Sequence, residues 1–139
     1  MMFETFCDWY EGSWNNREQT YTNPREAAYV LASHKRVSEN QFHCTYYHHR
    51  SKTPYRDLLL NVEHRDNVVL LKNSMTTLPF KLEGGTYVCK TQVKHNGSLY
   101  VFEAYLRDKY YGLNDQCFDS EGRMIRGLED GSLFRFRKT

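Results

Sequence analysis

The sequence has no apolar run long enough to cross a bilayer, and its apolar runs, such as residues 58–60 and 68–71, are only a few residues long. It also lacks the basic region and apolar stretch of a secretion signal, because acidic Glu4 and Asp8 occupy its first residues. These absences exclude a helical membrane protein. They lead us to expect a soluble, cytoplasmic protein with no membrane partner.

Cysteine is scarce, and Cys7, Cys44, Cys89 and Cys117 lie too far apart to form the closely spaced pairs of a zinc site. We expect all four thiols to be reduced, because nothing in the sequence indicates secretion. A glycine-rich phosphate loop and a Gly-x-Ser-x-Gly motif are also absent. Nucleotide-dependent enzymes and serine hydrolases therefore have no support.

Neither sign of charge dominates, because 19 basic residues stand against 17 acidic ones and the net charge is +2. This balance makes no global case for a nucleic-acid partner. Near the C-terminus, Arg135, Arg137 and Lys138 alternate with Phe134 and Phe136. A strand with one solvated face explains this pattern as well as phosphate binding does.

Aromatic residues, by contrast, make up 15% of the chain, and apolar residues make up 40%. Disordered chains lack such a composition, so we expect a single folded domain over residues 1–139. Turn signals recur between segments rich in Val, Thr, Tyr, Phe and Leu, which favours strands. The turn signals are Asp66-Asn67, Gly84-Gly85, Asn96-Gly97, Glu121-Gly122 and Asp130-Gly131.

This pattern predicts a short helix at 2–8, a helical turn from Pro24 capped by Asn23, and many short strands. The strongest hairpin signal is Asn96-Gly97, because both residues adopt positive φ readily. An open sheet of this size would expose its edges. We therefore expect an all-β fold, an antiparallel meander closed into a barrel with a ligand cavity, with a flattened sandwich as the alternative. The expected strands are 10–16, 28–37, 41–50, 55–65, 67–73, 79–83, 86–94, 99–107, 110–114, 123–128 and 132–138.

The segment 43–49, His-Cys-Thr-Tyr-Tyr-His-His, is the richest in metal-ligating side chains. On a strand, His43, Tyr47 and His49 face one side and His48 faces the other. Neighbours two apart on a strand rarely converge on one ion. We expect a polar strand along a cavity or at the surface, and no metal site.

Two other polar segments, 14–19 with Asn23-Pro24 and 54–56, have ordinary interpretations as a turn and as the entry to an edge strand. Together with later segments, however, they resemble the T-type phycobiliprotein lyases (the CpcT/CpeT family). No single segment is specific to this family, but the whole set of segments in this order is. The matching segments are Asn16-Arg17-Glu18-Gln19, Asn23-Pro24, Pro54-Tyr55-Arg56, Phe102-Glu103-Ala104, residues 115–122 as the family's Asp-x-Gly-x-Asp-x-x-Gly loop, and Gly127 with residues 131–136.

The chain departs from the family pattern at three positions. Cys117 stands where the family usually has Gly, Arg126 where it often has Trp, and Ser132 where it often has Pro. In length the chain is most similar to the compact version of the family carried by phages of marine cyanobacteria.

The resemblance implies a lipocalin-like, calycin-type barrel that holds a linear tetrapyrrole, or bilin, such as phycoerythrobilin. The bilin is the substrate, and no cofactor is implied. The implied activity is that of a chromophore lyase, which delivers the bilin to a cysteine of the β-subunit of a phycobiliprotein, phycoerythrin or phycocyanin, where a thioether forms. The resemblance also makes a bilin reductase a possible donor of the bilin. A homodimer of this protein would be compatible with the family.

The roles implied for individual residues follow from the chemistry of a bilin. Its two propionates suit the planar fork of arginine, which makes Arg17, Arg56 and Arg107 candidates and Lys90 and Lys94 weaker ones. Asp115, which matches the first Asp of the family's loop, is the expected catalytic residue. Its carboxylate would accept the pyrrole N–H bonds and stabilise a protonated, more electrophilic bilin. Asn16 and Gln19 are implied to orient the pocket mouth or to bond the lactam oxygens, and Tyr55 to stack on a pyrrole or to donate its hydroxyl. The other implied ligand-binding residues are Tyr47 and Glu103.

Two further interpretations stay open. The first is a non-catalytic bilin carrier on the same barrel. The second is a barrel that binds another apolar ligand, or one that stacks single-stranded nucleic acid on its aromatic residues.

Overall fold

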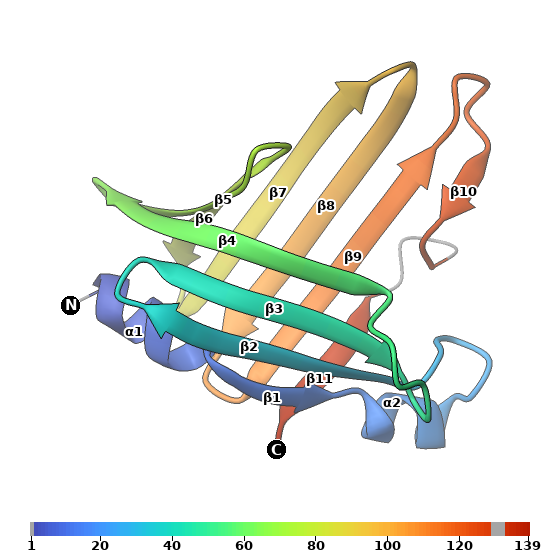
Figure 1. Ribbon diagram of the computed structural model, residues 1–139, viewed down its shortest axis with the longest axis horizontal. Helices are drawn as coiled ribbons and strands as arrows, with labels where there is room; N and C mark the ends of the chain where they lie inside the picture. The colour runs from blue at the N-terminus through green and yellow to red at the C-terminus, as the bar shows by residue number, and fades with distance from the viewer. Residues whose placement is uncertain (1, 129–132) are drawn as a thin grey trace.

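The computed structural model describes residues 2–128 and 133–139. In this part of the chain, α1 (Met2–Tyr10) and α2 (Arg17–Thr22) accompany strands that pair into one antiparallel sheet (Figure 1). None of the described helices is long and apolar enough to span a membrane. The strands are β1 (Gly12–Asn15), β2 (Val30–Ser38), β3 (Gln41–His48), β4 (Arg56–Arg65), β5 (Val68–Lys72), β6 (Thr77–Glu83), β7 (Thr86–His95), β8 (Ser98–Arg107), β9 (Tyr110–Phe118), β10 (Met124–Arg126) and β11 (Phe134–Lys138).

The sheet closes on itself at β9, which pairs with β8 along one edge and with β11 along the other, while β11 also pairs with β1. Over the described residues the ring contains ten strands, β1 to β9 and β11. The short β10 lies outside the ring and pairs with Cys117 and Phe118 at the end of β9. The predicted closed antiparallel meander barrel is confirmed, and the flattened sandwich is excluded.

Side chains alternate between the interior and the outer surface along each strand, as the pleat requires. In β3, Phe42, Cys44 and Tyr46 are buried, whereas His43 and Thr45 between them are partly exposed. The same alternation on β2 and β5 contributes to one aromatic-rich core inside the barrel, whereas β9 is buried over most of its length.

Helix α1 covers one end of the barrel (Figure 1). The ring of Phe6 lies 5.1 Å from the ring of Phe80 and 5.2 Å from that of Tyr87, and Phe6 is fully buried. These contacts reach the middle of β6 and the start of β7. The opposite ends of the same strands are therefore free of α1.

The local predictions were correct at the central hairpin and wrong at two places. Asn96 and Gly97 have φ values of 50° and 80°, which confirms the predicted tight turn. A polar turn was expected over residues 14–19, but from Arg17 the chain forms α2 instead. Residues 115–118, expected in a loop, extend β9, because β8 pairs with β9 as far as Leu99 opposite Phe118.

At Pro24, where a helical turn was predicted, the chain forms a single hydrogen-bonded turn, in which the Glu26 N–H donates to the Asn23 carbonyl at 3.1 Å. The Asp130-Gly131 turn signal and Ser132 lie outside the described residues.

Candidate ligand-binding cleft

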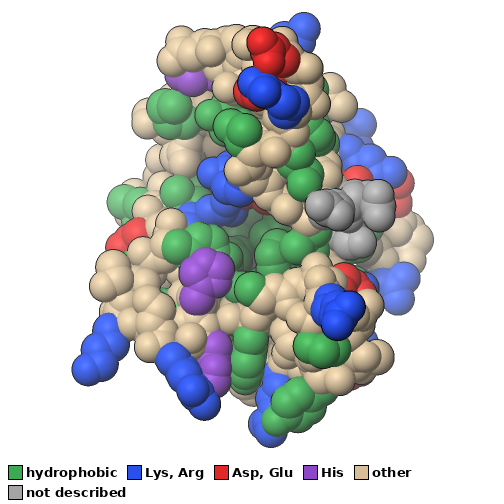
Figure 2. All heavy atoms as spheres, turned by 90° about the vertical axis from the view of Figure 1, so that its right-hand side faces the viewer, with side chains coloured by type: hydrophobic (Ala, Val, Ile, Leu, Met, Phe, Trp, Pro, Cys, Tyr) green, Lys and Arg blue, Asp and Glu red, His purple; other side chains and the backbone are tan. Residues whose placement is uncertain are grey.

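A cleft of about 300 Å³ opens at the end of the barrel away from α1. Figure 2 faces this side of the molecule and shows a hollow with hydrophobic side chains on its walls and Lys or Arg side chains beside it. The walls come from β4, the β5–β6 turn, β6, β7, β8, β9 and β10. The lining residues are Arg56, Leu58, Asn73, Met75, Thr76, Leu78, Thr91, Val93, His95, Tyr100, Val101, Phe102, Asp115 and Arg126.

A second depression, of about 580 Å³, lies at the α1 end beside Phe3 and His64. Its walls are mostly polar or charged, and Asn40, Asn61 and His64 within them are exposed. A site for an organic ligand needs largely apolar walls with a few converging polar groups. The cleft meets that description and the depression does not.

An ion pair between Arg56 and Asp115 lies in the wall of the cleft. Arg56 is the first residue of β4 and Asp115 points inward from β9, and their side chains are only 20% and 16% exposed. Burial disfavours the charge on Arg56, but the Asp115 carboxylate together with Tyr46 and Tyr55 outweighs this effect, so the pKa of Arg56 is raised. The ion pair gives the cleft a polar anchor among apolar side chains.

Arg126 of β10 contacts the same carboxylate from the mouth of the cleft. Its Nη2 lies 3.4 Å from Asp115 Oδ1, whereas Arg56 contacts Oδ2. The Arg126 guanidinium also lies 5.9 Å from the centre of the Tyr100 ring, a cation–π contact. One carboxylate is thus shared by one largely buried and one half-exposed guanidinium.

A buried chain of hydrogen bonds fixes the aromatic ring beneath Arg56. The Arg56 guanidinium lies 5.8 Å from the centre of the Tyr46 ring. The Tyr46 hydroxyl lies 2.8 Å from His34 Nε2, and His34 Nδ1 lies 3.0 Å from the Tyr10 carbonyl oxygen. Burial lowers the pKa of His34 to about 3, so the imidazole is neutral. Because a carbonyl only accepts, Nδ1 carries the proton, and the Tyr46 hydroxyl donates to Nε2.

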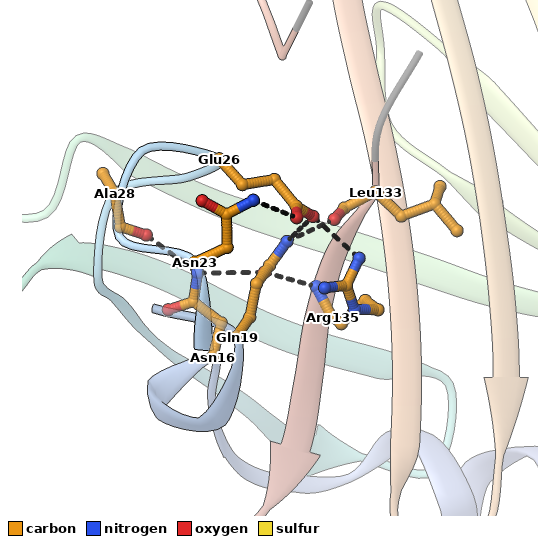
Figure 3. A network of polar contacts seen from close by, with 7 residues as sticks. All are labelled: Asn16, Gln19, Asn23, Glu26, Ala28, Leu133 and Arg135. Atoms are coloured by element: carbon orange, nitrogen blue, oxygen red, sulfur yellow. Dashed lines mark hydrogen bonds and ion pairs between the residues drawn. The ribbon is translucent and has the colours of Figure 1, made fainter. Parts of the chain in front are cut away.

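Asn16 and Gln19 lie away from the cleft, in the buried network of Figure 3. Asn16 Nδ2 donates to the Ala28 carbonyl at 2.8 Å, and Asn16 Oδ1 accepts from the Val30 N–H at 2.7 Å. Gln19 Nε2 donates to the Leu133 carbonyl at 2.7 Å. These contacts correct the expected placement of Asn16 and Gln19 at the pocket mouth, because their polar atoms hold α2 and its flanking loop instead.

The other predicted ligand-binding residues also lie outside the walls of the cleft. Arg17 donates to the Tyr21 hydroxyl at 2.9 Å, and Arg107 donates to Thr86 Oγ1 at 2.7 Å. Tyr55 stacks on His48 with ring centres 4.4 Å apart, beside Arg56 but outside the lining. The rest are Glu103, which accepts from the Tyr105 hydroxyl, Tyr47 on the outer face of β3, and Lys90 and Lys94 on exposed parts of β7.

Of the eleven predicted site residues, including the weaker candidates Lys90 and Lys94, the structure therefore brings together Arg56 and Asp115 alone in the cleft. Sequence reasoning gave no ligand role to Arg126, Tyr100 or Phe102. One signal was present, because two-residue alternation on adjacent strands can place Phe102 and Asp115 on the same face. The ladder pairs these two residues directly.

The histidine-rich strand β3 does not assemble a metal site in the described part of the chain. His43 pairs with Asp57 at 2.6 Å on the outer surface, and His49 stacks on Tyr29 with ring centres 4.4 Å apart. The described residues contain no group of three or more His, Cys, Asp and Glu side chains that could hold a metal ion.

Two solved structures share this fold over nearly the whole chain. One is the T-type phycobiliprotein lyase CpeT from Prochlorococcus phage P-HM1, with a TM-score of 0.83 and 24% identity over 99% of this chain and 98% of that one. The other is the CRL protein of Arabidopsis, with a TM-score of 0.79 and 15% identity over 98% of this chain and 96% of that one. Neither a family model nor a curated protein sequence matches the chain. At sequence identities of 24% and 15%, these two structural similarities establish the fold of this chain.

Proposed function

We propose that this protein is a bilin lyase, which binds a linear tetrapyrrole such as phycoerythrobilin in the cleft and delivers it to a cysteine of a phycobiliprotein β-subunit. The observation that carries the proposal is the Arg56–Asp115 ion pair in an otherwise largely apolar, aromatic-containing cleft of a closed barrel. The likeness to the phage lyase CpeT supports it at the level of fold.

The chemistry of the cleft matches the parts of a bilin. Leu58, Val93 and Phe102 offer apolar contact to the flat pyrrole rings. Arg56 offers a fork of N–H donors to a propionate. Asp115 accepts pyrrole N–H bonds, since an ionised carboxylate has about four lone-pair sites and the two arginines occupy one on each oxygen.

The size of the cleft leaves part of the ligand accessible. Its volume of about 300 Å³ is at the lower end of the range for sites that bind small organic molecules. An extended tetrapyrrole would therefore protrude at the mouth. A lyase needs such an accessible end, because the acceptor's thiol must reach ring A.

The proposed reaction is addition of the acceptor's S–H group across the ethylidene double bond of ring A. Sulfur bonds to the exocyclic carbon, the proton goes to the ring carbon, and nothing is oxidised or reduced. The lyase contributes by holding one conformation and one face of the bilin toward the thiol.

The protein's own thiols do not suit the role of nucleophile. All four cysteines are buried, and burial raises the pKa of Cys44 and of Cys89 to about 12 and that of Cys7 to about 11. Such thiols form little of the reactive thiolate near neutral pH. The reacting thiol accordingly belongs to the acceptor.

The test has two stages, each with its own readout. Purified protein is first titrated with phycoerythrobilin, and a saturable, red-shifted and sharpened absorbance band is expected. The complex is then mixed with an apo-phycoerythrin β-subunit, and covalent colour on the subunit is measured after denaturing electrophoresis.

The outcomes separate the functions. Binding with accelerated covalent transfer supports the lyase, and binding without transfer indicates a bilin carrier. If neither phycoerythrobilin nor phycocyanobilin changes its spectrum, the cleft serves another ligand. We also predict that a bilin reductase donates the bilin, that the protein forms a homodimer and that it is located in the cytoplasm. Each of these predictions needs a separate experiment.

A further inference from the structure

The described walls of the cleft carry an unbalanced positive charge. Their fully charged side chains are Arg56, Arg126 and Asp115, so two guanidinium groups share one carboxylate. Besides Asp115, the described walls contain one further side chain with a carboxyl or imidazole group, that of His95. A cleft with a surplus cation among apolar side chains favours a ligand that brings an anionic group.

Arg126 is the cation with unused hydrogen-bonding capacity. Its side chain is 54% exposed, whereas that of Arg56 is 20% exposed. Its hydrogen bond to Asp115 Oδ1 has a length of 3.4 Å, which is long for an N–H···O bond. A guanidinium has five N–H donors, and this bond takes one of them.

The backbone around Arg126 is held in place. Gly127 has a φ of +119°, and a Cβ atom there would lie 2.7 Å from Gln116 Cγ and 3.0 Å from the Asp115 carbonyl oxygen. Gln116 Nε2 donates to the Leu128 carbonyl at 3.0 Å. The strand that carries Arg126 is thus packed onto β9, and the guanidinium is presented at a defined point on the mouth.

We propose that Arg126 is a second carboxylate-binding residue of the cleft and that it makes binding selective for ligands with free carboxylates. This inference rests on the proposed function, in which the carboxylate is a propionate of the bilin. The propionate takes the place of Asp115 Oδ1 as the partner of Arg126. That oxygen then becomes available to a pyrrole N–H, while Oδ2 keeps Arg56.

The experiment compares phycoerythrobilin with its dimethyl ester, which has the same π-system and no carboxylate. Dissociation constants for both are measured by absorbance titration with the native protein, Arg126→Gln and Arg123→Gln. Arg123 is the matched control, because it is a nearby exposed arginine paired with Asp119 and Glu121 outside the cleft.

We expect Arg126→Gln to weaken binding of the free acid about three- to fivefold, the range for a pair that remains largely hydrated. Binding of the dimethyl ester should be unchanged, and Arg123→Gln should alter neither constant. An equal effect of Arg126→Gln on both ligands, or no effect on the free acid, overturns the inference. If the native protein binds neither ligand, the proposed function itself fails, and the inference fails with it.

Discussion

Asp115 carries both ion pairs of the cleft, so its substitution tests the site most directly. Asp115→Asn leaves two guanidinium groups without a counter-charge, one of them largely buried. We expect the free energy of unfolding to fall by about 1–3 kcal/mol. The absorbance spectrum of bound bilin should also change, because the amide cannot balance a protonated tetrapyrrole.

Asp57→Asn is the matched control, measured by urea unfolding beside Asp115→Asn. Asp57 pairs with His43 at 2.6 Å, but both side chains are about half exposed. Exposed pairs contribute roughly 0–1 kcal/mol, so stability should barely change. An unchanged bilin spectrum in Asp115→Asn would place Asp115 away from the pyrrole nitrogens.

His34 makes stability depend on pH in a predictable direction. Burial lowers its pKa from 6.5 to about 3 in the folded protein, so between these values the unfolded chain binds a proton that the folded protein does not. Stability is therefore lost as the pH falls through this window, by at most about 1.4 kcal/mol per pH unit. Urea unfolding at pH 7, 6 and 5 should show a steeper decline for the native protein than for His34→Gln, and parallel declines would contradict this account.

At the scale of elements, β10 depends on the glycine that follows it. Gly127→Ala places a Cβ against Gln116 and the Asp115 carbonyl, in a backbone conformation that favours glycine. We expect a loss of about 2–4 kcal/mol in the free energy of unfolding, from strain and overpacking together.

Gly122→Ala provides the control for this element. Gly122 has a φ of +83°, but nothing lies within 4 Å of the position of its Cβ. Gly122→Ala should therefore lower the free energy of unfolding by about 1 kcal/mol, because only the backbone conformation disfavours alanine. Equal urea midpoints for the two variants would mean that β10 shifts freely and does not hold Arg126.

At the scale of the whole molecule, the barrel closes through a short seam between β1 and β11. These strands share two ladder pairs, Trp14 with Lys138 and Asn15 with Arg137, whereas β7 and β8 share nine. Gln19 spans the seam from α2, because its Oε1 accepts from the Arg135 N–H at 2.9 Å and its Nε2 donates to the Leu133 carbonyl. The network in Figure 3 therefore adds buried hydrogen bonds where the ladder is shortest.

Gln19→Leu should open this seam. It leaves the Arg135 N–H and the Leu133 carbonyl without their partner, so we expect a loss of about 2–3 kcal/mol and faster hydrogen exchange at β11. Arg17→Leu, on the exposed face of the same helix, should change stability by less than about 0.5 kcal/mol. Unchanged stability with weakened bilin binding in Gln19→Leu would restore the ligand-binding role that the sequence suggested.

The features that local chemistry controls could be predicted from the sequence. Asn96-Gly97 makes the predicted turn, and Phe42, Cys44 and Tyr46 alternate with polar neighbours as a strand of a barrel requires. Helix α2 was missed because residues 17–22 contain no apolar repeat, and its one buried residue, Gln19, is held by contacts distant in the sequence. The ordered polar segments also pointed to a fold that the phage lyase CpeT shares.

By itself the sequence determined the strand-rich character, the tight turns and the closed meander, because each depends on residues close together in the chain or on burying a sheet's edges. Only the tertiary structure decided the site. Arg56, Asp115 and Arg126 meet because β4 lies across the barrel mouth from β9 and β10 follows the edge of β9. Strand register and barrel closure determine which charged side chains lie together in a low-dielectric space. The type of each residue alone specifies neither the register nor the closure.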